Sequence, residues 1–253
     1  MIACFAAAAC LLAPFGSGAG RARPPVSLVA APAHVALAGA ARQVVTLTST
    51  GTRPVVVEVV RAGYGLDLRG RPRILPRRRS WVSVRPRRVA IAPGGHATLV
   101  VVSTPPRRAE PGDHSELVLL TTRPLRTASL SVRVRLGLVV VVRAPGRIVR
   151  RLTVSRVRLR AHRLELLVAN RGNVTETIAR RCFVVTVRRA RGVVVRLHPA
   201  PRRILPHAFG LVAIPFHRAR GPLRVAVALS PGPPCPRPSA RAFVVRPEKG
   251  MRN

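Results

Sequence analysis

The stretch Leu130-Ser-Val-Arg-Val-Arg-Leu136 decides the fold class, because apolar and polar side chains alternate along it without interruption. Successive side chains of a β-strand point to opposite faces of the sheet. The leucines and valines of this stretch therefore face a core, and Arg133 and Arg135 face solvent, as in a half-buried antiparallel sheet. The valine-rich run that follows, up to Val142, extends this strand or adds a second one.

Similar strand-like runs recur over the rest of the chain, separated by proline and glycine. The 253 residues are 47% hydrophobic and only 3% aromatic, and they include 25 prolines and 19 glycines. Valine dominates the runs because its branched Cβ packs well on a pleated surface, and frequent proline and glycine leave little room for long helices. Examples of such runs are residues 42–48, 54–60, 164–169 and 223–229. We therefore predict an all-β protein.

The strand-like runs fall into two series, with an interruption at Ala144-Pro-Gly-Arg147. Each series contains a strand, a glycine turn and a further strand, with the turn at Ser49-Thr-Gly51 in the first and Asn170-Arg-Gly-Asn173 in the second. Short strands with regular turns are typical of β-sandwiches. We predict two tandem immunoglobulin-like β-sandwich domains at residues 24–143 and 151–247, with a linker at 144–150 and a disordered tail at 248–253.

The N-terminal sequence predicts an exported protein. Residues 2–13 form an apolar run that is too short to span a bilayer and fits the apolar part of a signal peptide. Ser17-Gly18-Ala19 offers a cleavage site, so we assign residues 1–19 to the signal peptide. Because no Lys or Arg precedes the run, either the start codon lies upstream or the signal is atypical; a buried N-terminal strand or helix is the alternative. No later apolar run is long enough for a transmembrane span.

Two cysteines remain after removal of such a signal peptide, Cys182 and Cys235. An even number of cysteines in an exported chain predicts a disulfide bond between them, and two free thiols are the alternative. In the chain-entropy model, closing the loop between residues 182 and 235 stabilises the protein by about 4 kcal/mol. Cys10 is not followed by the small residue that a lipid-attachment site needs, which argues against a lipoprotein.

The formal net charge is +37, and Lys249 is the only lysine among the 45 basic residues. A field of this size attracts polyanions such as anionic wall polymers, anionic lipid and nucleic acid. The codons of arginine, alanine, proline, glycine and valine are rich in G and C, so a GC-rich genome raises the arginine content without selection for a ligand. We interpret much of the charge as compositional and expect nucleic acid to bind only nonspecifically.

The densest basic stretch also carries the only tryptophan. Arginine next to an aromatic ring can contact phosphate and stack on rings, so the stretch is a candidate polyanion contact. The alternative is a core tryptophan at the start of a strand, flanked by solvated arginines. The candidate residues are Arg77, Arg78, Arg79, Trp81, Arg85, Arg87 and Arg88.

Little in the sequence indicates catalysis. The chain has 8 acidic residues, mostly placed singly, and none of the common hydrolase, metalloprotease or nucleotide-binding motifs. Asp113, His114 and Glu116 form the densest acidic and histidine group, but neighbouring residues of a strand point to opposite faces and chelate poorly together. We interpret residues 110–116 as a turn that leads into a strand. We predict no enzyme activity, no catalytic residues, no metal site and no cofactor.

Several turn motifs of the chain resemble those of known surface proteins. Their order is similar to that in bacterial cell-surface proteins with tandem immunoglobulin-like domains, notably the WxL-interacting type of Gram-positive walls. More distantly, the chain resembles pilus chaperones and major sperm protein domains. The WxL-interacting type usually ends in a membrane-anchoring helix, which this sequence does not show. The motifs are Pro32-Ala-His-Val-Ala-Leu, Ser49-Thr-Gly, Gly63-Tyr-Gly-Leu-Asp, Trp81-Val-Ser-Val-Arg-Pro, Ile91-Ala-Pro-Gly-Gly, Glu110-Pro-Gly-Asp-His-Ser and Ala169-Asn-Arg-Gly-Asn-Val.

The resemblance implies a non-catalytic cell-envelope protein, extracellular or envelope-associated, that acts as a binding or structural module. Its expected partner is a surface protein or an anionic wall polymer. Strand addition at an open sheet edge is one mode of binding, by analogy with pilus chaperones. The alternative function is an arginine-driven polyanion-binding protein, for wall teichoic acid, anionic lipid or nucleic acid.

Overall fold

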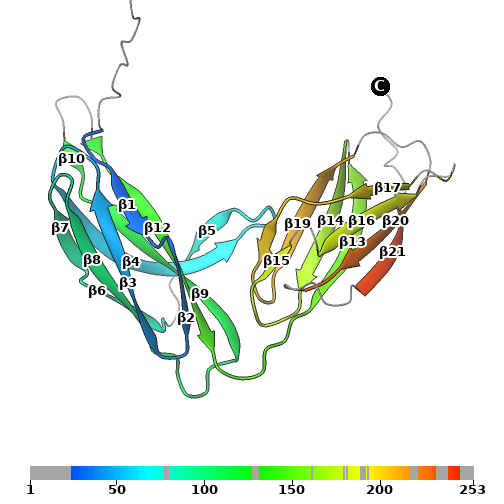
Figure 1. The fold of residues 1–253 in the computed structure, drawn as a ribbon, viewed down its shortest axis with the longest axis horizontal. Coiled ribbons are helices and arrows are strands. Elements are labelled where there is room, and N and C mark those ends of the chain that lie inside the picture. Colours follow the sequence, from blue (N-terminus) through cyan, green and yellow to red (C-terminus); the bar gives the residue numbers. More distant parts are fainter. Residues whose placement is uncertain are drawn as a thin grey trace, which may run out of the picture.

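The computed structural model describes residues 24–76, 80–126, 131–160, 162–178, 180, 182–188, 192, 194–216, 222–231 and 239–245, and every structural statement below concerns these residues. They form strands and turns without a helix. Figure 1 shows two lobes of β-sheet, one built from the N-terminal half of the chain and one from the C-terminal half. The prediction of an all-β protein with two tandem sandwiches is confirmed.

Two larger sheets and one short hairpin form the described part of the first domain. One has the strand order β1 (Leu28–Ala31), β3 (Ala41–Ser49), β8 (His96–Ser103) and β6 (Val82–Arg85). The other has the order β2 (His34–Ala38), β12 (Arg135–Ala144), β9 (Gly112–Thr122), β4 (Val55–Leu66) and β5 (Pro72–Leu75), and β7 (Arg88–Ile91) also pairs with β4. A short hairpin of β10 (Leu125–Arg126) and β11 (Ser131–Val132) lies between β9 and β12 in the chain.

Three sheets form the second domain. They consist of β13 (Leu152–Arg160), β14 (Arg163–Asn170) and β19 (Phe209–Pro215); β15 (Glu176–Ile178) and β18 (Arg202–Ile204); and β17 (Val194–Leu197), β16 (Phe183–Arg188), β20 (Leu223–Leu229) and β21 (Ser239–Val245). Among the described residues, no helix is long and apolar enough to cross a membrane. Residues 1–23 and 246–253 lie outside the described part, so the signal peptide and the tail stay predictions.

Each domain has its own aliphatic core, because alternate residues of its strands point inward. Leu47 and Leu120 are fully buried in the core of the first domain, and Leu166 and Phe183 are fully buried in the core of the second. The two cores form separate clusters. Burial of apolar surface, at about 25 cal/mol per Å², therefore stabilises each domain separately.

The described residues of the stretch 130–136 have the predicted alternation of buried and exposed side chains. Val134 and Leu136 pack against the core of the first domain, and Arg133 and Arg135 are exposed. Leu130 lies outside the described residues. The same alternation continues into β12, where Leu138 and its second neighbours toward the C-terminus are fully buried.

The N-terminal strand changes sheets, and this change leaves part of β12 without a neighbour. β1 pairs antiparallel with β3 in one sheet, whereas β2 pairs parallel with β12 in the other. Pro32 lies between them and has no N–H to donate to either ladder. β2 covers only residues 139–143 of β12. Residues 135–138 pair with β9 on one side, and on the other side no described strand pairs with them.

Separate cores predict separate responses to core mutation. Leu47 and Leu166 are both fully buried, one in each domain, so each Leu→Ala change should cost about 2–5 kcal/mol of unfolding free energy in its own domain. Trp81 is the only tryptophan and packs against the first core, so its fluorescence follows the first domain. In urea, Leu47→Ala should lower the midpoint of the fluorescence transition. Leu166→Ala should change the unfolding free energy derived from this transition by no more than about 0.5 kcal/mol. Equal shifts in the two variants would show one cooperative unit instead.

Candidate functional site

The predicted basic cluster is divided between two ends of a strand. Trp81 precedes β6, whereas Arg85 ends it, and Arg85, Arg87 and Arg88 are all exposed. Arg85 and Arg87 line a shallow hollow with Pro86, away from the tryptophan. Arg77, Arg78 and Arg79 lie outside the described residues, so a joint patch of all seven side chains stays a prediction.

Trp81 instead lies at the end of the first sandwich that faces the second domain. Its ring is tilted against the ring of His114, with the centroids 4.0 Å apart. The Glu116 carboxylate holds the segment before β6, since it accepts hydrogen bonds from the backbone N–H of Trp81 at 2.9 Å and from the Ser80 hydroxyl at 2.5 Å. Trp81 is half-buried and is held by these contacts.

Cys182 is buried immediately before β16 and is disulfide-bonded. Cys235 lies outside the described residues, so its pairing with Cys182 stays a prediction.

Asp113 joins the two domains, and it does so through both oxygens of its carboxylate. Oδ1 accepts a hydrogen bond from Nε of Arg143 at 2.7 Å, and Oδ2 accepts one from the backbone N–H of Thr175 in the second domain at 2.8 Å. The Asp113 side chain is only 3% exposed, whereas that of Arg143 is 48% exposed. The pair is therefore buried on the acidic side and open to solvent on the basic side.

Backbone contacts place the two domains directly against each other at this joint. The Asp113 N–H donates to the Asn173 carbonyl at 2.8 Å. Gly112 has a φ of +119°, and a Cβ at this position would lie 2.0 Å from the same carbonyl oxygen, so no other residue fits. Residues 110–116, predicted as a turn, thus supply the start of β9 and half of the interdomain joint.

The second motif, Asn170-Arg-Gly-Asn173, supplies the other half of the joint. Asn173 uses its whole amide: Nδ2 donates to the carbonyls of Pro111 and Arg147, and Oδ1 accepts from the Val149 N–H. Asn170 is buried and ties the turn to the segment after β18, with Nδ2 donating to the Leu205 carbonyl at 3.1 Å. The two turn motifs read from the sequence therefore meet in space.

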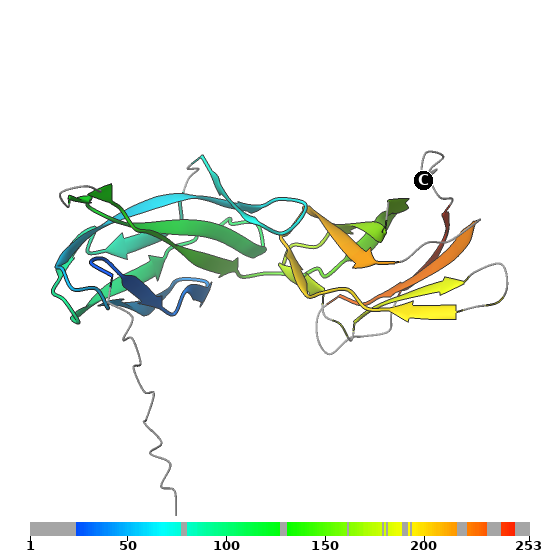
Figure 2. The same cartoon turned by 90° about the horizontal axis from the view of Figure 1, so that it is seen from above.

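The β4–β5 hairpin forms a second bridge between the domains. The Leu68 carbonyl, at the tip of the hairpin, accepts the N–H of Leu211 in β19 at 2.6 Å and a side-chain N–H of Arg202 at 3.3 Å. Asp67 shapes the tip, because its Oδ1 accepts the N–H groups of Arg69 and Arg71. Figure 2 shows this hairpin, in cyan, extending from the first domain to β19, in orange.

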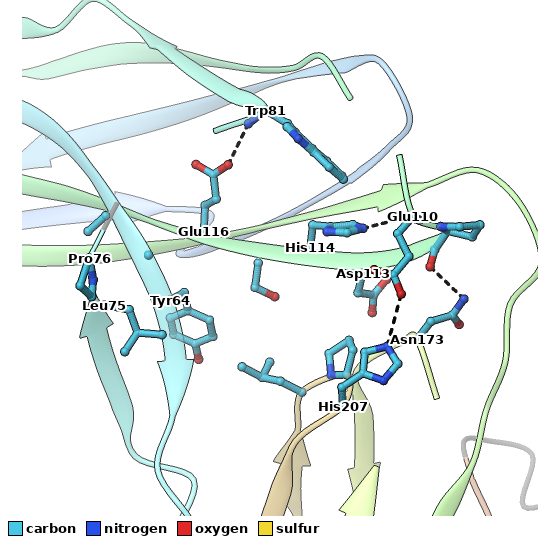
Figure 3. Close-up of a pocket in the computed structure, with 16 residues that line it drawn as sticks. Tyr64, Leu75, Pro76, Trp81, Glu110, Asp113, His114, Glu116, Asn173 and His207 are labelled. Atoms are coloured by element: carbon cyan, nitrogen blue, oxygen red, sulfur yellow. Dashed lines mark hydrogen bonds and ion pairs between the residues drawn. The ribbon is translucent and has the colours of Figure 1, made fainter. Parts of the chain in front are cut away.

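A pocket of about 570 Å³ lies between the joint and the hairpin and is lined by both domains. Figure 3 shows Trp81, His114 and Tyr64 around it on the first domain, with Asn173 and His207 entering from the second. Its polar groups are largely engaged within the protein, as the Glu116 contacts above illustrate. In the described part of the chain, no group of three His, Cys, Asp or Glu side chains could hold a metal ion.

A smaller hollow of about 210 Å³ beside the pocket is basic. Arg143 of the first domain and Arg203 of the second both line it, together with His34 and Tyr64. Burial and then the charge of Arg203 lower the pKa of His34. Burial raises the pKa of Tyr64, which Arg203 partly opposes. Sequence reasoning did not find Arg203 or Leu68, since neither stands in a motif and Leu68 acts through its backbone.

The open edge of β12 is the other candidate site. Thr122 donates its N–H to the Val134 carbonyl, so the backbone groups of even-numbered residues face β9. Val139 donates its N–H toward the β2 side, to Ala33. The N–H and C=O groups of successive residues in a strand point to opposite sides. Those of the odd-numbered Arg135 and Gly137 therefore point away from β9, along the part of the β12 edge that β2 does not cover.

Loss of the Asp113 carboxylate should loosen the joint. In Asp113→Asn, an amide replaces the acceptor of a charge-assisted hydrogen bond, and we expect a loss of about 1–3 kcal/mol in unfolding free energy. The interdomain angle measured by small-angle X-ray scattering should become more variable. Glu58→Gln is the matched control, because its pair with Arg123 is half exposed (47% and 52%) and worth about 0.2–1 kcal/mol. Equal losses in both variants would contradict a special role for Asp113.

The same carboxylate predicts a pH dependence. Burial alone would raise the pKa of Asp113, but the hydrogen bonds from Arg143 and Thr175 outweigh it and hold the pKa below its ordinary value. A lowered folded-state pKa contributes stability that is complete above about pH 4 and is lost as the pH falls through the folded value. Thermal unfolding should therefore show a steeper loss of Tm as the pH falls below about 4 in the native protein than in Asp113→Asn. Parallel curves would exclude this group as the cause.

Comparison with known proteins finds likeness in fold only. No family model and no curated protein sequence matches the chain. The class 5 fimbriae chaperone CfaA is similar with a TM-score of 0.56 and 12% identity, over 88% of this chain and 100% of that one. A chain of a chaperone–tip adhesin complex of CFA/I fimbriae biogenesis gives a TM-score of 0.56 and 11% identity, over 88% and 100%.

A chain of the CsuC–CsuE pre-assembly complex from the Csu pili of Acinetobacter baumannii gives a TM-score of 0.50 and 12% identity, over 87% of this chain and 98% of that one. These structures belong to pilus assembly, which was the more distant resemblance in the sequence. The WxL-interacting type has no counterpart among them, so that resemblance stays a prediction. The chain thus has the two-domain immunoglobulin-like fold that is also found in pilus chaperones.

Proposed function

We propose that this chain is an exported, non-catalytic binding module of the cell envelope, which binds a surface protein by adding one strand of that protein to the open edge of β12. The observation that carries this proposal is the edge itself. A strand edge without a partner offers a row of N–H and C=O groups to which an extended segment can pair. The described part of the chain leaves residues 135–138 of β12 in this state.

The side chains beside this edge support an apolar ligand. Val134 and Leu136 are half-buried and pack against the first core, so an added strand could cover their remaining surface and extend that core. Such burial would add apolar area to the backbone hydrogen bonds. The edge therefore offers both components that strand addition uses, a backbone ladder and alternate side-chain positions.

The comparisons support the class of partner. A chaperone–tip adhesin complex and a chaperone–adhesion subunit complex are among the structures with a similar fold. By analogy with these complexes, a surface protein is the proposed partner of this chain. Export rests on the apolar run at residues 2–13. Membership of the WxL-interacting type, binding of a wall polymer, and the polyanion-binding alternative with its arginine cluster stay predictions beside this proposal.

A proline at the open edge tests the proposal. Gly137→Pro removes an N–H that faces the open side and not β9, so it should abolish pairing there without breaking the sheet. Gly137→Ala is the matched control, since it adds the same Cβ, which would lie 3.2 Å from Leu117 Cδ1, and keeps the N–H. The probe is a labelled synthetic peptide with valine and threonine in alternation, and binding is measured by fluorescence anisotropy.

We expect Gly137→Ala to bind this peptide within about twofold of the native protein, and Gly137→Pro to bind it at least about tenfold more weakly. The Trp81 fluorescence transition in urea should be the same for both variants, which would exclude unfolding as the cause. Equal binding by the two variants, or no binding by the native protein, would refute strand addition at this edge.

A further inference from the structure

We infer that the strand received by β12 is acidic on its outward face, with glutamate or aspartate alternating with apolar residues. This inference rests on the proposed function and specifies the chemistry of its ligand. An added strand has the same alternation as its neighbour, so its inward side chains lie beside Val134 and Leu136. Its outward side chains lie beside Arg133 and Arg135.

Arg133 and Arg135 are free to make such pairs. Both are exposed, and within the described residues neither takes part in an ion pair or a side-chain hydrogen bond. The acid nearest to Arg135 in its cross-strand row is already engaged. Arg135 is opposite Thr121 on β9, which is opposite Glu58 on β4, and Glu58 is paired with Arg123 at 3.1 Å. The positive charge at this edge therefore lacks a partner within the described part of the chain.

Charge also argues against a second copy of this chain as the occupant. If two copies paired along their β12 edges, each would bring arginines to a neighbour that already carries Arg133 and Arg135. Like charges opposite each other on adjacent strands are destabilising, and charged residues on an edge strand are a common means of preventing self-pairing. An acidic strand has the reverse effect, because opposite charges in cross-strand pairs are stabilising.

The net charge of +37 would attract any acidic peptide, so the test must separate the local pair from the general field. Arg85 and Arg87 provide the control. They have the same spacing of two residues, are exposed, and lie at β6, on the far edge of the other sheet of the same domain. The double variants Arg133→Glu/Arg135→Glu and Arg85→Glu/Arg87→Glu change the net charge equally.

Three labelled peptides serve as probes, each with valine at alternate positions and with glutamate, threonine or lysine at all positions between. In low salt, the native protein should bind the glutamate peptide about tenfold more tightly than the threonine peptide and bind the lysine peptide most weakly. The difference should shrink in 0.5 M salt, where the Debye length is only about 4 Å. Arg133→Glu/Arg135→Glu should reverse the order, and Arg85→Glu/Arg87→Glu should keep it.

The outcomes distinguish a failure of the acidic specificity from a failure of strand addition. If all three peptides bind equally, or if both double variants change the order alike, the acidic specificity is wrong, while strand addition stands as long as Gly137→Pro still loses binding. If none of the peptides binds, the proposed function and this inference fail together. If the order reverses only in Arg85→Glu/Arg87→Glu, the acidic ligand belongs to the β6 edge and the inference is overturned.

Discussion

The contact between Asp113 and the second domain is the constraint on which the rest of the arrangement depends. One buried carboxylate accepts a hydrogen bond from Arg143 at the end of β12 and another from the Thr175 amide. The start of β9, the end of β12 and the turn between β14 and β15 are thereby held at one point. The pocket lies beside this point, and the β4–β5 hairpin contacts β19 through a separate hydrogen bond at Leu68.

The open edge has a different origin, in the path of the N-terminal strand. A strand of this length could cover one sheet edge completely, but here its two halves belong to two sheets. β12 is therefore covered near the joint and left without a partner at its other end. The binding proposal thus depends on how the chain divides its hydrogen bonds, and not on a special residue type at the edge.

The sequence predicted most of the fold because strand alternation is a local property. Val134 and Arg135 could be assigned to opposite faces from their neighbours alone, and the two-sandwich architecture followed from the repetition of such runs. The turn motifs at residues 110–116 and 170–173 were also visible, but their contact was not, because it joins residues far apart in the chain. The basic stretch from Arg77 to Arg88 stays a prediction as a joint patch, because Arg77, Arg78 and Arg79 lie outside the described residues. Of the described members, Trp81 precedes β6 and Arg85 ends it, a separation that the sequence alone did not reveal. Leu68 could not be identified at all, since a backbone carbonyl leaves no mark in the sequence.

The β4–β5 hairpin has a mechanical consequence. Two domains joined only at their linker form a hinge, and either can swing without disturbing the other. A second attachment at Leu68, away from Asp113, restricts this hinge. Rotation of the second domain about the Asp113 contact must stretch the hydrogen bonds at Leu68, and the reverse holds as well. Load applied to the second domain is then shared by β4, a central strand that reaches the opposite end of the first sandwich. A force that pulls the two domains apart is thus transmitted as tension along β4 and does not only bend the linker between them.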